Sequence, residues 1–386
     1  MGQQTISIMK HIWIYLGSLF LSAILMDCSA SAQKEEVTTP VTEEPLNIIF
    51  LIGDGMGVPQ ISTAYFFNDE QAHFSRFSHI GLQRTTDSYR KVTDSAAGAT
   101  AFSIGEKTYT RAIGVDSDSV AQETILETLQ KDGYRTGLIS LTSITHATPA
   151  AFYAHVRDRD QHEDIAAQLI EADIDYLAGG GRDYFSKRTD GQDLLAQLQK
   201  KGYHLDTTAL TAPKRQQRNA FLLADNSLPA KVEGRGDFLP AATRQALDYL
   251  TAQKAPFFLM VEGSYIDWAG HAEDAEMLIQ EVEDFDQVLG VAFDYIEAHA
   301  NTLLLVTADH ETGEVSIGKK YGPTDASGNR PNIPDQVRVN FHSDQHSAEL
   351  VPVFAEGPGA ELFRGIYDNA DIYHKLMTAL GRKVNH

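Results

Sequence analysis

The chain has 386 residues and a formal net charge of −21, with 53 acidic residues against 32 lysines and arginines. This charge argues against a nucleic-acid-binding protein, because such proteins need a basic surface that displaces counterions from phosphate. Hydrophobic residues make up 42% of the chain and charged ones 22%, and we find no repeat or long low-complexity tract, so most of the chain is expected to be globular.

The N-terminal segment has the pattern of an export signal. Lys10 precedes an apolar run from Ile12 to Met26, and Ala30-Ser31-Ala32 offers the small residues that a signal peptidase accepts. A retained membrane anchor is the alternative, but the run is short for a membrane span and no basic stop-transfer flank follows it. We therefore expect residues 1–32 to be a signal peptide, residues 33–45 a flexible linker, and the protein to be periplasmic or secreted.

Cys28 is the only cysteine of the chain, and it offers a second way of processing. Leu25-Met26-Asp27 before it weakly resembles a bacterial lipobox, although Asp27 stands where that motif has a small residue. A signal that ends before a lipidated Cys28 would make the protein an outer-membrane lipoprotein, and this is the one route by which we expect contact with a membrane. In either case the mature domain has no disulfide bond, so core packing and bound metals must stabilise it.

Four apolar runs predict the strands of a mainly parallel central sheet flanked by helices on both faces, which is an α/β fold. Each run leads to polar side chains of the types that bind metals. The runs are residues 46–53, 134–141, 257–261 and 302–307, and the polar residues after them are Asp54, then His146 and Thr148, then Glu262, then Asp309 and His310. Because the carboxyl ends of parallel strands meet at one edge of the sheet, we expect a metal site there.

The remaining sequence is consistent with one domain over residues 46–386. Residues 183–237 are polar and rich in Lys, Arg, Gln and Asp, so they are expected to form a peripheral subregion. Residues 314–345 contain many Gly, Pro, Asp and Asn residues and predict a long surface loop, which is often functional at that length.

Residues 92–101 (VTDSAAGATA) place Ser95 before a run of very small residues, which is typical of a helix N-terminus. Free N–H groups and the helix dipole favour an anion there, and small side chains let a phosphate and metals approach. An ordinary serine N-cap would give the same pattern. No histidine lies beside Ser95 in the sequence, but a bound zinc can replace such a base by lowering the pKa of the hydroxyl.

Asp267 and His271 are spaced so that a carboxylate and an imidazole lie one helical turn apart, which makes a two-ligand platform for a metal. Such a pair is more often a solvated ion pair, and Asp309-His310 by itself is no stronger. The metal interpretation gains support from the carboxylates that follow apolar strands, because an unpaired carboxylate in such a place is costly.

Six motifs together resemble the alkaline phosphatase family, in the order in which that family has them. They are Ile52–Gly57, Thr93–Ala96, Ala147–Ala150, Glu262–Ser264, Thr307–Glu311 and His346-Ser347. The resemblance runs from about Asn47 to the C-terminus and is greatest to the compact bacterial branch that includes cold-adapted marine enzymes.

The resemblance implies hydrolysis of phosphate monoesters through a phosphoserine intermediate, with two zinc ions and one magnesium ion, in a homodimer. Ser95 would be the nucleophile, and Arg159 would clamp the non-bridging phosphate oxygens. One zinc would be bound by Asp267, His271 and His346, the other by Asp54, Asp309 and His310, and the magnesium by Asp54, Thr148 and Glu262.

Two positions depart from the enterobacterial pattern of this family, which has Asp and Lys near the metals. This chain has His146 and Trp268 there, a pair typical of cold-adapted and marine relatives. The resemblance therefore implies His146 as a neighbour of the third metal site and Trp268 as a substrate-binding residue. Glu314 stands where relatives often have a glycine.

Three other functions fit the residues less well. A sulfatase needs a Cys or Ser within a motif that contains Pro and Arg, and Ser95–Ala99 lacks both. A phosphodiesterase usually has a threonine nucleophile and lacks a clamp like Arg159. A non-catalytic phosphate- or metal-binding protein would be expected to have lost at least one reactive group, whereas all of them are present here.

Overall fold

A ten-stranded sheet forms the centre of the protein, with the strand order β14-β2-β13-β8-β1-β7-β3-β4-β6-β5. The computed structural model describes residues 45–68 and 70–382, all within one compact unit, so the predicted signal and nearly all of the predicted linker lie outside the described residues. Within the described residues, no helix combines the length and the apolar character needed to cross a membrane.

The four predicted runs form four neighbouring strands at the middle of this sheet. They are β8 (Thr302–Thr307), β1 (Asn47–Gly53), β7 (Phe257–Gly263) and β3 (Arg135–Ser143), and each pairs in parallel with the next. Every residue of β1, β7 and β8 is buried, which explains why these strands read as nearly continuous apolar runs. Their carboxyl ends therefore meet at one edge, as predicted.

The outer strands complete a sheet that is mainly parallel. On one side lie β13 (Val351–Glu356), which is antiparallel to both of its neighbours, then β2 (His79–Arg84) and β14 (Gly365–Asp368). On the other side lie β4 (Tyr176–Gly180), β6 (Asn219–Leu222) and β5 (His204–Asp206), all parallel.

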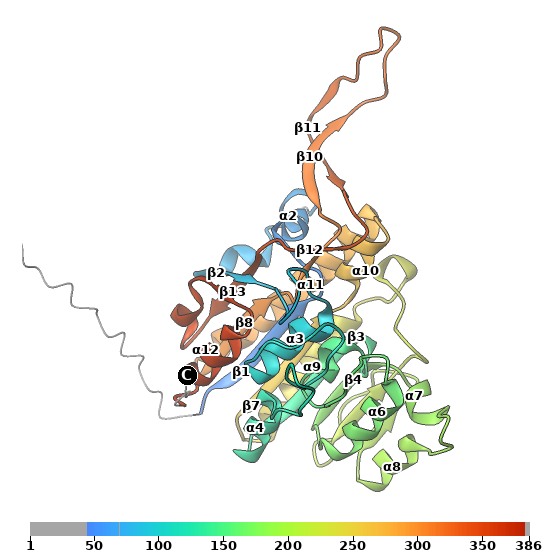
Figure 1. Cartoon of the computed structure of the whole chain (residues 1–386), viewed down its shortest axis with the longest axis vertical. Coiled ribbons are helices and arrows are strands. Elements are labelled where there is room, and N and C mark those ends of the chain that lie inside the picture. Colours follow the sequence, from blue (N-terminus) through green and yellow to red (C-terminus); the bar gives the residue numbers. More distant parts are fainter. Residues whose placement is uncertain (1–44, 69, 383–386) are drawn as a thin grey trace, which may run out of the picture. The chain divides into compact units, whose positions relative to one another are not determined.

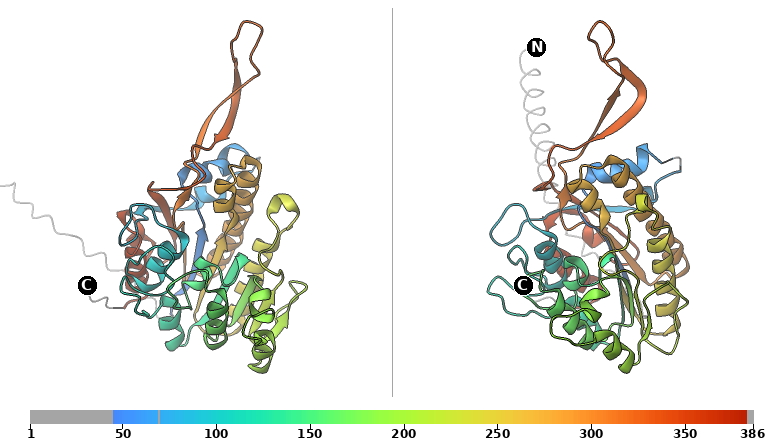
Figure 2. Two further views of the ribbon diagram at one scale, coloured as in Figure 1. Left: turned by 45° about the vertical axis from the view of Figure 1, so that its right-hand side comes forward. Right: turned by 90° about the vertical axis from the view of Figure 1, so that its right-hand side faces the viewer.

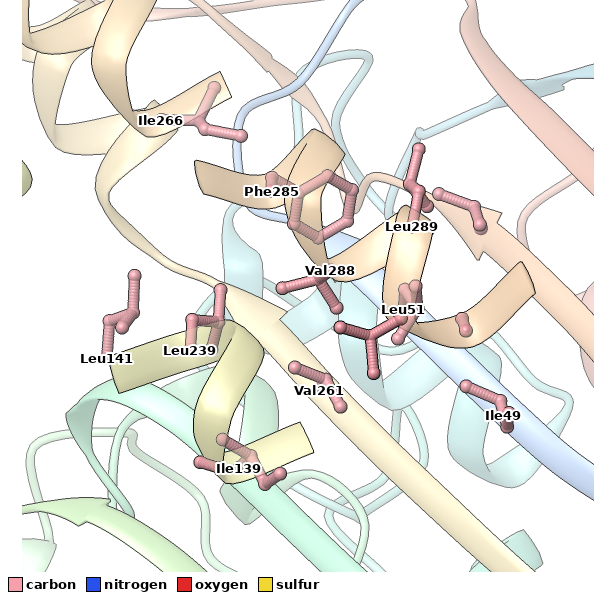
Figure 3. Close-up of a cluster of buried hydrophobic side chains, with 14 of the residues drawn as sticks. Ile49, Leu51, Ile139, Leu141, Leu239, Val261, Ile266, Phe285, Val288 and Leu289 are labelled. Atoms are coloured by element: carbon pink, nitrogen blue, oxygen red, sulfur yellow. The ribbon is translucent and has the colours of Figure 1, made fainter. Parts of the chain in front are cut away.

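Helices cover both faces of the sheet, as the sequence predicts (Figures 1 and 2). Alternate residues of β1 point to opposite faces: Ile49 and Leu51 belong to one core, and Ile48 and Phe50 to the other. The first core contains α2 (Val58–Phe66), α9 (Phe238–Ala252), α10 (Tyr265–His271) and α11 (Ala275–Ala298). Figure 3 shows part of this core, where β1 and β7 lie against Phe285, Val288 and Leu289 of α11.

The second core contains helices that are all shorter than α9 and α11. They are α3 (Ser95–Ile104), α4 (Ile125–Lys131), α5 (Ala147–Ala150), α6 (His162–Glu171), α7 (Asp183–Ser186), α8 (Leu194–Lys200) and α12 (Asp371–Ala379). Three short 3₁₀ helices, His73–Arg76, Lys231–Glu233 and Ala360–Phe363, lie in the connections.

Residues 183–237, expected as a peripheral subregion, also supply an edge of the central sheet. This segment contains α7, α8, β5 and β6, and β6 pairs with β4. All four residues of β6 are buried. The polar composition of the segment concealed these short strands.

Residues 314–345, expected as a long surface loop, are at the surface but form mainly a β hairpin. β10 (Ser316–Tyr321) pairs antiparallel with β11 (Asn332–Asn340), and most residues of both strands are exposed or half-buried. Figure 1 shows this hairpin extending beyond the end of the sheet. Ile317 of β10 and Val339 of β11 pack against the first core, but most other residues of the hairpin are exposed, so no apolar run marked these strands in the sequence.

Candidate active site

The predicted metal-binding residues gather at the carboxyl edge of the sheet in three groups. Within each group, the potential ligand atoms lie within 4.8 Å of one another. We call them group 1 (Asp267, His271 and His346), group 2 (Asp54, Asp309 and His310) and group 3 (Asp54, His146 and Glu262). Groups 1 and 2 contain the same residues as the two zinc sites that the resemblance implies, and Asp54 joins groups 2 and 3.

Group 1 combines the helix α10 with the short strand β12 (His346–Ser347). Asp267 and His271 lie one turn apart on α10, and the Nε2 atoms of His271 and His346 are 3.1 Å apart. The Nδ1 of His271 donates to the carbonyl of Asp344 over 2.6 Å, and the Nδ1 of His346 donates to the carbonyl of Thr93 over 2.9 Å. In the neutral rings each Nε2 then presents a lone pair to the other, an arrangement that suits a shared cation.

Group 2 is completely buried and contains carboxylate oxygens without a hydrogen-bond donor. Both oxygens of Asp54 and the Oδ2 of Asp309 have no partner in the described structure. His310 Nε2 is 3.4 Å from Asp54 Oδ1 and 3.4 Å from Asp309 Oδ2. Burial is the main cause that raises the pKa of Asp54 well above its usual range, and the nearby charge of Asp309 raises it further. Burial also raises the pKa of Asp309 to about 6. Because unpartnered buried carboxylates are costly, these atoms fit a metal site.

Group 3 has the same signature. Glu262 Oε1 is buried without a partner, while its Oε2 accepts from the hydroxyl of Ser140, and burial raises the pKa of Glu262 to about 7. Thr148, at the start of α5, has a buried hydroxyl without a hydrogen-bond partner. Burial lowers the pKa of His146 to about 3, so this ring is neutral at physiological pH. The oxygen atoms of Asp54, Glu262 and Thr148 are the donors that hard cations prefer.

Ser95 is the first residue of α3 and is buried beside group 2. Its hydroxyl lies 3.2 Å from His310 Nε2. The N-cap of this helix is Asp94, whose carboxylate accepts from the N–H of Ala97, so the serine N-cap alternative is wrong. Small residues are required here, since a Cβ at Gly98 would lie 2.9 Å from the carbonyl oxygen of Asp309.

Arg159 lies between the start of α3 and group 3. Its Nη1 donates to Asp94 over 3.1 Å, and its Nη2 lies 3.3 Å from His146 Nε2. Burial opposes ionisation of Asp94, but the charge of Arg159 and two backbone N–H groups hold its pKa below the usual range. The guanidinium is therefore fixed beside Asp94, the residue that precedes Ser95.

Trp268 lies on α10 next to Asp267, and its ring packs edge-on against two other rings. The ring centroids are 4.6 Å apart for Tyr265 and 6.4 Å apart for His146. This places Trp268 beside group 3.

Sequence reasoning missed two side chains of this region. Asp94 orients Arg159 and caps α3, and an aspartate directly before a helix of small residues could have revealed it. Thr312 contacts ligands of groups 1 and 2, and no sequence signal points to it. The structure also accounts for the usual glycine at position 314, because Glu314 has a positive φ of 45° that glycine adopts without strain.

The fold and the site together define a class of protein. Carboxylates and imidazoles lie around a serine at a helix N-terminus, and all of them lie at the carboxyl edge of an α/β sheet. This is the architecture of a hydrolase for anionic esters.

Comparisons with known proteins identify the family within this class. The alkaline phosphatase family model matches residues 46–332 and 323–382. Alkaline phosphatase 3 of Bacillus subtilis is 32% identical over 95% of each chain. The structure of alkaline phosphatase from the Antarctic bacterium TAB5 superposes with a TM-score of 0.84 and 43% identity, covering 88% of this chain and 99% of that one. The cold-active alkaline phosphatase of Shewanella sp. gives a TM-score of 0.76 and 30% identity, over 87% of this chain and 100% of that one.

The chain belongs to the alkaline phosphatase family, and it is an enzyme that hydrolyses phosphate monoesters. The predicted resemblance to cold-adapted bacterial members is confirmed.

Proposed function

We propose that the protein hydrolyses phosphate monoesters through a phosphoserine on Ser95, with two zinc ions and one magnesium ion bound around it. The observation that carries this proposal is the set of buried, unpartnered donor atoms in groups 2 and 3 next to the serine hydroxyl.

The donor types support this choice of metals. Groups 1 and 2 each offer carboxylate and imidazole ligands, which zinc prefers, and group 3 with Thr148 offers mainly oxygen, which magnesium prefers. A His-to-Asp variant of the TAB5 enzyme has Mg bound in a site called M3, which supports a third site of this kind. Bound zinc would supply positive charge that lowers the pKa of the Ser95 hydroxyl and stabilises the leaving oxygen.

Arg159, Ser95 and Trp268 then have specific roles in the reaction. Arg159 holds two non-bridging oxygens of the ester, a bidentate contact that a planar guanidinium can make. Ser95 Oγ loses its proton and attacks phosphorus, the bond from phosphorus to the ester oxygen breaks, and the alcohol leaves with a proton. Water then attacks the phosphoserine, which restores the Ser95 hydroxyl and releases phosphate. Trp268 contributes to binding the substrate.

Acid quenching during turnover of a ³²P-labelled monoester tests this mechanism, because it traps the phosphorylated peptide. We expect the label on the peptide that contains Ser95, and none in Ser95→Ala. A labelled peptide without Ser95 would contradict the assignment. Metal analysis of the purified protein, with monoester, diester and sulfate-ester assays on the same sample, separates a monoesterase from the rival activities.

We also propose that the protein is exported and forms a homodimer. The export proposal depends on residues 1–32, and membrane attachment would require a lipid on Cys28. The intact mass of cell-derived protein distinguishes a start near Gln33 from a lipidated Cys28, and retention of residues 1–32 would contradict export. Light scattering during size-exclusion chromatography tests the dimer.

A further inference from the structure

Thr312 occupies a position between groups 1 and 2. It ends the short strand β9 (Glu311–Thr312), which pairs antiparallel with β12, and it lies directly opposite His346 in that pair. Its side chain is completely buried. The hydroxyl donates to Asp267 Oδ1 of group 1, and it lies 3.1 Å from His310 Nδ1 of group 2. One hydroxyl therefore contacts a ligand of each proposed zinc site.

The chemistry of these two contacts fixes the position of the protons. A hydroxyl has a single hydrogen to donate, and a metal-binding carboxylate accepts but does not donate. The hydrogen of Thr312 therefore points to Asp267, and Thr312 Oγ1 accepts from the Nδ1–H of His310. With its proton on Nδ1, the neutral ring has its lone pair on Nε2, which faces Asp54 and Asp309.

Close packing holds the Thr312 side chain in this orientation. A Cβ on Gly55 would lie 2.8 Å from Thr312 Oγ1, and a Cβ on Gly270 would lie 2.8 Å from Thr312 Cγ2. The side-chain amide of Gln60 donates to the Thr312 carbonyl over 2.8 Å. The backbone and both branches of the side chain are thus fixed, so the hydroxyl cannot readily turn away from Asp267 and His310.

We propose that Thr312 is a positioning residue that couples the two zinc sites, because its hydroxyl fixes the tautomer of His310 and the orientation of Asp267 at the same time. This inference rests on the proposed zinc sites. Partners that bond to metal ligands in this way typically contribute tenfold to a hundredfold to metal affinity. Loss of the Thr312 hydroxyl is therefore expected to weaken both zinc ions together, although Thr312 binds neither.

The test compares Thr312→Val, which keeps the shape and removes the hydroxyl, with Thr312→Ser, which keeps the hydroxyl. Thr243→Val is the matched control, because this buried hydroxyl donates to the carbonyl of Leu239 within α9. The zinc dissociation constants of all four proteins are measured by competition with a chromogenic chelator. We expect Thr312→Val to weaken both zinc ions by about tenfold to a hundredfold, while Thr312→Ser and Thr243→Val stay close to wild type.

Several outcomes would overturn the inference alone: wild-type affinity for both ions in Thr312→Val, weakening of one ion only, or an equal loss in Thr312→Ser. Wild-type protein that bound no zinc would instead overturn the proposed zinc sites, and the coupling with them. If Thr312→Val does not fold, ¹⁵N shifts of labelled histidines in the wild-type holoenzyme provide a second measurement. We expect the proton of His310 on Nδ1, and a proton on Nε2 would refute the proposed role.

Discussion

Removal of the metals should leave buried carboxyl groups that destabilise this enzyme increasingly as the pH rises. Without a cation, the crevice buries the carboxyl groups of Asp54, Asp309 and Glu262. Burial raises the pKa of Asp309 from 3.8 to about 6 and that of Glu262 from 4.5 to about 7. Between these values each of the two carboxyl groups binds more protons in the folded metal-free protein than in the unfolded chain. Asp309 and Glu262 therefore lower the free energy of unfolding as the pH rises from about 4 to about 7. The buried imidazoles of His146 and His310 act in the opposite direction, because burial lowers their pKa values.

The size of this effect follows from the pKa shifts. Each of the two raised pKa values corresponds to roughly 3 kcal/mol at neutral pH, which is a large part of the stability of an ordinary domain. Bound zinc and magnesium would remove this cost by neutralising the charges. The holoenzyme should therefore be more stable than the metal-free protein at neutral pH, because it lacks the loss that these two carboxyl groups cause.

Urea unfolding of chelator-treated and metal-loaded protein at several pH values between 4.5 and 8 measures both effects. Asp309→Asn is the informative variant, because it removes one buried charge and keeps the shape. At pH 7 the metal-free variant should be more stable than metal-free wild type by up to roughly 3 kcal/mol, whereas with metals present the order should reverse. The stability difference between metal-free Asp309→Asn and metal-free wild type isolates Asp309, and a difference that does not grow as the pH rises over this range would refute the reasoning.

Three further predictions concern single side chains. Ser95→Ala should abolish the phosphoenzyme and lower kcat strongly while leaving zinc content unchanged, and turnover at the wild-type rate would exclude Ser95 as the nucleophile. Arg159→Ser should lower the kcat/KM for a monoester by about tenfold to a hundredfold, which corresponds to one lost charge-assisted contact. The kcat/KM for a diester should fall much less. Equal losses on both substrates would contradict the proposed contact between Arg159 and the non-bridging oxygens. Arg235→Met should destabilise the enzyme by about 3–5 kcal/mol, because Glu281 loses its guanidinium partner and Asp284 keeps only the ammonium of Lys231 among the described residues. A urea midpoint close to that of wild type would show that Lys231 suffices to compensate these buried charges.

The sequence predicted the central part of the fold because burial of a strand on both faces restricts its residues to apolar types. Parallel strands covered on both faces must be apolar along their whole length, so β1, β7 and β8 were visible as apolar runs. The short strand β6, next to the edge of the sheet, and the hairpin strands β10 and β11 were not visible in this way. β6 has four residues, and most residues of β10 and β11 are exposed or half-buried, so none of these strands leaves an apolar run like those of the central strands.

The sequence by itself also determined the candidate ligands, because a carboxylate or imidazole directly after a buried strand has few roles other than a functional one. Only the tertiary structure decided which of them meet. His346 reaches Asp267 through the pairing of β12 with β9, and Arg159 reaches the start of α3 through Asp94. Thr312 became recognisable only when its hydroxyl was found between Asp267 and His310. Contacts of this kind join segments far apart in the chain, and they depend on how helices and strands pack in three dimensions, which local composition and spacing do not encode.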